Sequence, residues 1–114
     1  MIDKQLLIDA ENGKAEAQSY LGYKYIKDYW KPVALKLIKK YKLTNTSSIL
    51  DVGCGKGFLL FEIKKVLPNI FICGFDLSKY AILRSPKDIK KYLFVHDAKN
   101  KFPLKNKKFD LVIS

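Results

Sequence analysis

Residues 49–58 read Ile-Leu-Asp-Val-Gly-Cys-Gly-Lys-Gly-Phe, a short apolar run that leads into a turn with three glycines. The run Ser48–Val52 predicts a buried β-strand, and Phe58–Leu67 predicts a helix that ends before Pro68. A strand that passes through a glycine-rich turn directly into a helix is typical of a nucleotide-binding crevice. The glycines let the backbone bend sharply and let a ligand approach without a Cβ in the way.

The alternation of strands and helices continues along the chain. The predicted strands are Ser48–Val52, Ile70–Phe75, Tyr92–His96 and Phe109–Ile113. The predicted helices are about 3–11, 14–28, 32–42, 58–67 and 78–83. Continuous apolar strands separated by helices predict an α/β fold, with a parallel sheet covered on both faces. We expect residues 1–30 to form an N-terminal helical extension and residues 31–114 to form the sheet domain.

Three kinds of site compete for the glycine turn. A phosphate-binding P-loop needs GxxxxGK followed by Ser or Thr, which is not present here. A dinucleotide site needs GxGxxG, but the third glycine comes one residue early and Phe58 stands in its place. The spacing is GxGxG, with Asp51 two residues ahead of the first glycine.

Carboxylates stand at the ends of the next two predicted strands. Asp76 follows Gly53 by twenty-three residues, and Asp97 follows the third strand. A carboxylate at the position of Asp76 can accept hydrogen bonds from both hydroxyls of a ribose. A carboxylate at the position of Asp97 can accept a hydrogen bond from an adenine amino group, although a turn or cap role is also open for each aspartate.

Taken in order, these pieces resemble class I methyltransferases, which use S-adenosylmethionine. The resemblance covers about residues 31–114 and includes the stretch Lys107–Ser114, which is similar to the approach to the family's fourth strand. It implies a Rossmann-like parallel sheet of about four strands in the order 3-2-1-4, incomplete relative to the family's order 3-2-1-4-5-7-6. In the family's full order the fourth strand pairs with a fifth. With only four strands the fourth strand is an open edge, which favours self-association.

The resemblance also implies roles for single residues. Asp51, Gly53 and Gly55 would border the methionine and ribose parts of the cofactor, and Gly57 would allow the following helix to pack close. The implied cofactor-binding residues are Asp51, Gly53, Cys54, Gly55, Gly57, Asp76, Leu77, Asp97 and Ala98. No catalytic residue is assigned, because the family's acceptor-side residues lie largely after the fourth strand. We therefore expect little or no methyl transfer by this chain alone.

Composition limits the other function classes. The 114 residues carry a net charge of +11, yet Arg84 is the only arginine. Nucleic-acid binders favour arginine forks, so a lysine-coated solvated surface is favoured over an RNA-associated protein.

Cys54, Cys73 and the one histidine lack the spacing of a zinc site. No apolar run is long enough to span a bilayer and no secretion signal is visible, so we expect a cytoplasmic protein. An inactive methyltransferase-like binding module is the other alternative.

Overall fold

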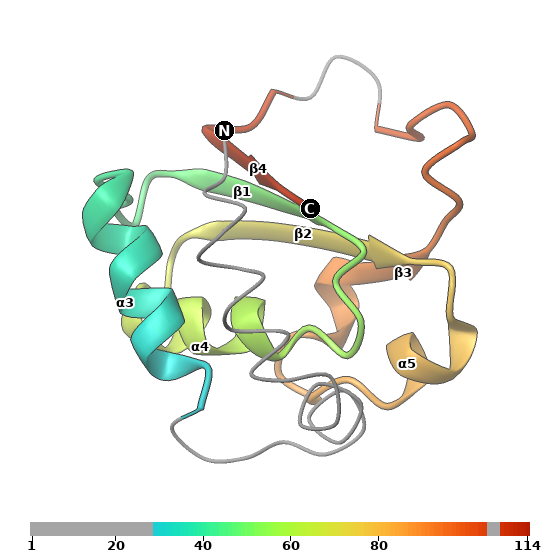
Figure 1. The fold of residues 1–114 in the computed structure, drawn as a ribbon, viewed down its shortest axis with the longest axis horizontal. Coiled ribbons are helices and arrows are strands. Elements are labelled where there is room, and N and C mark those ends of the chain that lie inside the picture. The colour runs from blue at the N-terminus through green and yellow to red at the C-terminus, as the bar shows by residue number, and fades with distance from the viewer. Residues whose placement is uncertain (1–28, 105–107) are drawn as a thin grey trace.

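A four-stranded parallel sheet forms the centre of the molecule (Figure 1). The structure is a computed structural model that describes residues 29–104 and 108–114. The strands are β1 (Ser48–Val52), β2 (Phe71–Asp76), β3 (Leu93–Val95) and β4 (Leu111–Ile113), and the helices are α3 (Lys31–Lys40), α4 (Phe58–Val66), α5 (Lys79–Leu83) and the short 3₁₀ helix η1 (Lys90–Tyr92). The strand order β3-β2-β1-β4 confirms the predicted order. The two helices predicted within residues 1–28 lie outside the described residues.

Helix α3 begins as its sequence predicts and buries one face. Pro32 lies in the first turn, where a missing N–H costs no helical hydrogen bond. Val33, Ala34 and Leu37 are buried, and they join the core formed with α4 and the sheet. Lys39 and Lys40 lie in the last turn, where cations interact favourably with the helix dipole.

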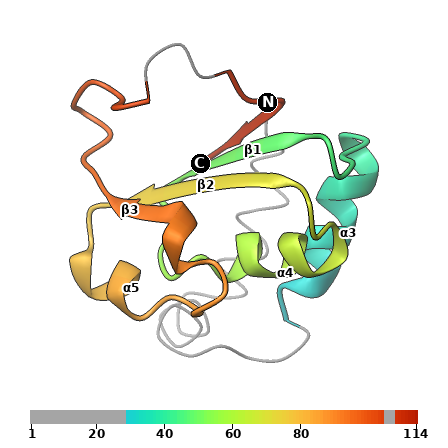
Figure 2. The ribbon, with the colours of Figure 1, turned by 180° about the vertical axis from the view of Figure 1, so that it is seen from behind.

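Within the described residues, helices α3, α4 and α5 all lie on one face of the sheet (Figures 1 and 2). Ile63 of α4 and Ile82 of α5 belong to the same buried cluster as Leu37 of α3. The crossovers from β1 to β2 and from β2 to β3 run in the same direction across the sheet. Right-handed crossovers in one direction place their helices on one face.

The opposite face is covered differently. Leu50, Cys73 and Phe75 are buried there, and the phenyl rings of Phe102 and Phe109 pack against them. The connection from β3 to β4 runs back past β2 and β1, so a right-handed path carries it over this second face. Within the described parts of residues 96–110 that connection contains no helix, and aromatic side chains take the place of a helical layer.

Strands β1 and β4 are joined at their start by a reciprocal side-chain contact. The Asp110 carboxylate accepts a hydrogen bond from the Ser48 backbone N–H at 2.7 Å, and the Asp110 N–H donates to the Ser48 hydroxyl at 3.1 Å. These bonds fix the register in which Ile49 lies opposite Leu111. They also explain why β4 begins at Leu111, two residues later than predicted.

Candidate functional site

The glycine turn folds back onto the neighbouring strand. The N–H groups of Gly53 and Cys54 both donate to the Phe75 carbonyl, at 2.8 and 3.0 Å. Gly53, Gly55 and Gly57 all have positive φ, between 59° and 78°. L-residues with a Cβ rarely adopt that conformation, so the GxGxG spacing is what allows this turn. The turn therefore brings the start of α4 next to the carboxyl end of β2.

Asp76 holds this arrangement together from the end of β2. Its Oδ2 accepts a hydrogen bond from the Gly55 N–H at 2.9 Å, and its Oδ1 accepts one from the Ser78 N–H at 2.9 Å. Its backbone carbonyl accepts from the His96 N–H at 3.0 Å. One residue thus connects the glycine turn, the start of α5 and the end of β3. Each carboxylate oxygen still has acceptor capacity beyond its single backbone partner.

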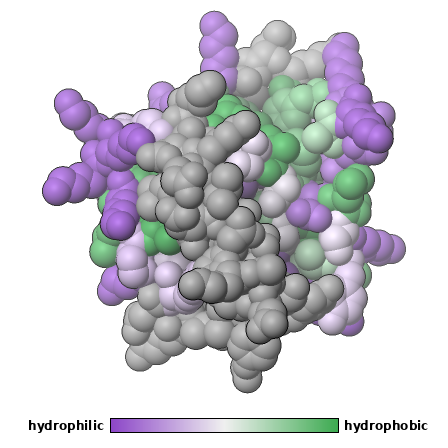
Figure 3. All heavy atoms as spheres, viewed as in Figure 1, coloured by the Kyte–Doolittle hydropathy of each residue, from purple (hydrophilic) through white to green (hydrophobic). Residues whose placement is uncertain are grey.

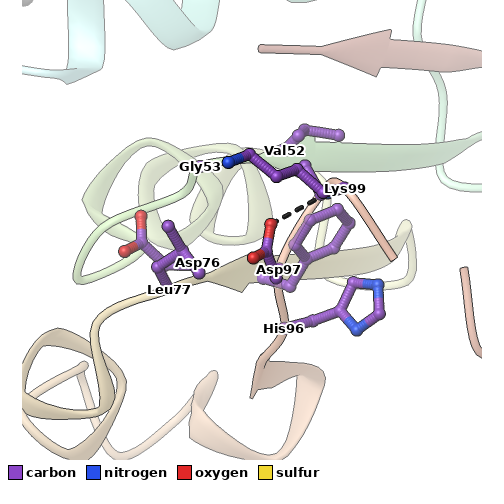
Figure 4. A pocket seen from close by; sticks show the side chains of 9 residues that line it. Val52, Gly53, Asp76, Leu77, His96, Asp97 and Lys99 are labelled. Atoms are coloured by element: carbon purple, nitrogen blue, oxygen red, sulfur yellow. Dashed lines mark hydrogen bonds between the residues drawn. The ribbon is translucent and has the colours of Figure 1, made fainter. Parts of the chain in front are cut away.

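A cavity of about 320 Å³ lies at the carboxyl ends of β1, β2 and β3. Its volume is in the range of small-molecule and cofactor sites. Its lining residues are Val52, Gly53, Phe75, Asp76, Leu77, His96, Asp97, Ala98 and Lys99. Figure 4 shows that they come from three consecutive strand ends and the loop after β3. Parallel α/β sheets bind ligands in such a position.

The structure brings five of the nine predicted site residues to this cavity. They are Gly53, Asp76, Leu77, Asp97 and Ala98. Asp51, Cys54, Gly55 and Gly57 do not line it, although Gly55 is joined to Asp76 by the hydrogen bond described above. Asp51 is buried in the sheet, opposite Gly74 on one side and Ile113 on the other.

Asp97 combines a position in the cavity with a turn. Its Oδ1 accepts a hydrogen bond from the Lys99 N–H at 2.9 Å, drawn as the dashed line in Figure 4, and its carbonyl accepts from the Asn100 N–H. This is the hydrogen bonding of an Asx-turn. The turn role considered for Asp97 in the sequence is therefore real, and it also fixes the Asp97 carboxylate at the cavity.

Four lining residues were not among the predicted site residues: Val52, Phe75, His96 and Lys99. The His96 ring packs edge-on against Phe75 with centroids 5.1 Å apart, and its buried Nε2 has no hydrogen-bond partner. The alternation of side chains along a strand is the signal that identifies Val52. Val52 stands two residues after the buried Leu50 and therefore lies on the same face of β1. No comparable sequence signal identifies Lys99.

The Cys54 thiol lies in a setting that disfavours its ionised form. Burial raises the pKa of Cys54 above its usual range, and the nearby carboxylates of Asp51 and Asp76 raise it further. A thiolate is the reactive form of cysteine. The surroundings of Cys54 therefore favour its neutral thiol form.

This setting predicts a pH dependence of stability. A thiol with a raised pKa in the folded state stabilises the fold below the unfolded-state value and loses that contribution as pH rises above it. Between about pH 9 and pH 10, the free energy of unfolding should fall by up to ~1.4 kcal/mol more in the native protein than in Cys54→Ala. Chemical denaturation of both proteins at pH 8, 9 and 10 measures this difference. Parallel pH curves for the two proteins would contradict the assignment.

The described residues also set limits on other sites. Among residues 29–104 and 108–114, no group of three or more His, Cys, Asp or Glu side chains is arranged to hold a metal ion. In the same part of the chain, no helix has the length and apolar character needed to cross a membrane.

A parallel sheet with a glycine turn, strand-end carboxylates and a cavity between them defines a Rossmann-like nucleotide-binding domain. The comparison with protein families is more specific: residues 43–114 match the family described as Methyltransferase domain. The match covers more than half of the chain, and the chain belongs to this methyltransferase family. The resemblance seen in the sequence is thereby confirmed.

Individual relatives agree with this assignment. A malonyl-[acyl-carrier protein] O-methyltransferase of Bacillus cereus is 29% identical over 117 aligned positions, which include 100% of this chain and 42% of that protein. The plantazolicin methyltransferase BpumL, solved with a desmethylPZN analog and SAH, superposes with a TM-score of 0.56 at 27% identity, over 96% of this chain and 39% of that one. The chain therefore spans about two-fifths of the length of these relatives.

A further solved structure supports the fold alone. A putative S-adenosyl-L-methionine-dependent methyltransferase from Methanococcus maripaludis superposes with a TM-score of 0.65 at 19% identity. The superposition covers 90% of this chain and 49% of that one. The sheet and its helices are thus a shared architecture across distant sequences.

Proposed function

We propose that this chain binds S-adenosylmethionine and forms the cofactor-binding part of a methyltransferase whose acceptor is unassigned. The observation that carries the proposal is the position of Asp76. Its carboxylate lies at a cavity between strand ends and contacts the glycine turn through the Gly55 N–H. A carboxylate with two oxygens beside such a turn matches the two adjacent hydroxyls of an adenosine ribose.

The residues around the cavity suit the adenosine part of the cofactor and leave open backbone beside it. We assign Asp76 to the ribose hydroxyls, and Asp97 with the Ala98 backbone and Leu77 to the adenine. A Cβ added at Gly53 or Gly55 would meet no atom within 4 Å, so the backbone there is open to a ligand. These two glycines, with Cys54 and the buried Asp51 behind them, would border the methionine part. Gly57 has a packing role instead, because a Cβ there would meet Leu93 at 2.8 Å.

The cofactor supplies a methyl group that is already activated by a sulfonium. The bound cofactor would pass this methyl group to an acceptor atom by in-line displacement. The contribution of the protein is to hold the cofactor in one orientation so that the methyl group faces the acceptor. The strand-end carboxylates and the glycine turn would provide that orientation.

Calorimetry of the chain with S-adenosylmethionine and with S-adenosylhomocysteine tests this proposal. Saturable binding of both at a stoichiometry of one supports it, and no heat with either compound rules it out. Measurable methyl transfer from the bound cofactor to an acceptor would separate an enzyme from an inactive binding module. A steep salt dependence of RNA binding without cofactor binding would favour the RNA-associated alternative instead.

We further propose that the chain self-associates through β4. This strand pairs with β1 on one side and has no strand on its other side among the described residues. Open strand edges pair readily with another chain. Leu111 and Ile113 are buried, whereas Val112 is 45% exposed, so position 112 accepts a substitution without loss of core packing.

Val112→Lys should abolish this association, because a lysine blunts an edge strand. Sedimentation velocity measures the concentration-dependent dimer of the native chain and its loss in the variant. Val95→Lys is the matched control, since Val95 is 48% exposed on β3, the other edge strand. A native chain that remains monomeric, or a dimer lost only with Val95→Lys, would contradict the assignment to β4.

We also propose a cytoplasmic location for the protein. Cys54 and Cys73 are free thiols in the structure, which suits a reducing compartment.

We propose, in addition, that the chain divides at residue 30. The family match begins at residue 43, and α3 begins the described helical layer at Lys31. Residues 1–30 are accordingly proposed as an N-terminal extension to the methyltransferase domain.

A further inference from the structure

Lys99 projects over the cavity from the loop after β3. The Asx-turn holds its backbone, because the Lys99 N–H donates to the Asp97 carboxylate at 2.9 Å. Figure 4 shows its side chain extended across the cavity toward Gly53, and both residues line that cavity. The lysine is exposed, so its ammonium group lies at the rim and remains open to solvent.

The negative charges at the cavity lie at the strand ends, and the positive charge of Lys99 lies on its solvent-exposed side. Asp76 and Asp97 lie at the strand ends, and each already accepts a backbone hydrogen bond. Within residues 29–104 and 108–114, the Lys99 ammonium forms no salt bridge or hydrogen bond with a side chain or carbonyl. Figure 3 shows other hydrophilic side chains projecting outward from several sides of the molecule. Lys99 differs from a general surface lysine because it lies over a site.

The position of the ammonium group limits which ligand it serves. In the proposed binding mode, the part of the cofactor next to Gly53 contains the sulfonium, which is itself a cation. A second cation there does not stabilise the sulfonium, but it attracts an anion that approaches the methyl group. An anionic acceptor would therefore meet an opposite charge at the point where transfer occurs.

We infer that Lys99 is a specificity-determining residue that selects an acceptor with a negative charge at the atom that takes the methyl group. This inference rests on the proposed function. For an acceptor oxygen anion, such as a carboxylate, a carbon–oxygen bond forms as the carbon–sulfur bond breaks, and the bonding pair passes to sulfur. The products are a neutral ester and a neutral thioether. No proton moves, so this step needs no general base.

The test uses the chain loaded with S-adenosylhomocysteine and follows backbone amide shifts by NMR. The probes are methyl hydrogen succinate, inorganic phosphate and the neutral dimethyl succinate. We expect the anions to shift the amides of Gly53 and Lys99 saturably, and the neutral diester to leave them unchanged. Lys99→Met should weaken anion binding by about five- to tenfold, with the effect shrinking as salt is added. The anion that binds more tightly, carboxylate or phosphate, identifies the acceptor chemistry.

Lys108→Met is the matched control, because it removes the same charge from an exposed residue that precedes β4. Lys108 therefore lies toward the amino ends of the strands, whereas the cavity lies at their carboxyl ends. It should change anion binding less than twofold, and both variants should bind S-adenosylhomocysteine within twofold of the native chain. Anion shifts that are unchanged in Lys99→Met would overturn the inference. A large loss of S-adenosylhomocysteine affinity in Lys99→Met would also overturn it, because the lysine would then serve the cofactor's own carboxylate. If the native chain fails to bind S-adenosylhomocysteine at all, the proposed function itself fails.

Discussion

Asp76→Ala should weaken the binding of S-adenosylhomocysteine by about a hundredfold, as measured by calorimetry. Hydrogen bonds to a charged group contribute about 1.5–3 kcal/mol each, and every 1.4 kcal/mol is a tenfold change in affinity. The alanine removes the proposed acceptor for the ribose hydroxyls. It also leaves the N–H groups of Gly55 and Ser78 without their partner, so the glycine turn is no longer held in place.

Two further variants separate these effects. Asp76→Asn keeps the size of the side chain and one acceptor oxygen, and we expect a loss of about tenfold. Asp88→Ala removes an exposed carboxylate that does not line the cavity, and it should leave affinity unchanged. Native affinity in Asp76→Ala would show that this carboxylate does not hold the ribose.

Gly57→Ala should destabilise the fold by about 2–5 kcal/mol in chemical denaturation. The residue has φ +77°, where a Cβ costs roughly 1–2 kcal/mol. The new methyl group would also lie 2.8 Å from Leu93 Cδ1 and 2.9 Å from Ile89 Cδ1. Both side chains are buried, and forcing them aside costs about 1–3 kcal/mol.

Gly55→Ala provides the comparison for Gly57→Ala. Gly55 also has positive φ, +59°, but an added Cβ would meet no atom within 4 Å. Its substitution should therefore cost only the backbone strain, about 1–2 kcal/mol. The difference between the two variants isolates the crowding at Leu93 and Ile89. Equal destabilisation by both substitutions would show that Gly57 has no special packing role.

Much of the fold could be predicted because strand and helix patterns are local. The apolar run Ser48–Val52 matches β1 residue for residue, and β2 is displaced by one residue from its predicted bounds. What covers the second face could not be predicted from the same patterns. It depends on the strand order, which places β4 beside β1 and so sends the β3–β4 connection over the second face. That connection carries phenylalanines in place of a helix.

The candidate site was only partly predictable for a related reason. Asp76 and Asp97 could be found because strand ends are visible in the sequence and parallel strands end at one edge. The double role of Asp76, which holds both Gly55 and Ser78, depends on distances that the turn sets in three dimensions. The reach of Lys99 across the cavity depends on the Asx-turn at Asp97 and on the shape of the glycine turn opposite.

We propose that the cavity at the ends of β1, β2 and β3 holds the adenosine of S-adenosylmethionine. Titration of the isotope-labelled chain with S-adenosylhomocysteine, followed by backbone amide shifts in NMR spectra, tests this claim directly. The amides of Gly53, Gly55, Leu77 and Ala98 should shift together and saturate at one equivalent. Saturable binding that moved only amides remote from these strand ends, or no binding at millimolar ligand, would contradict it.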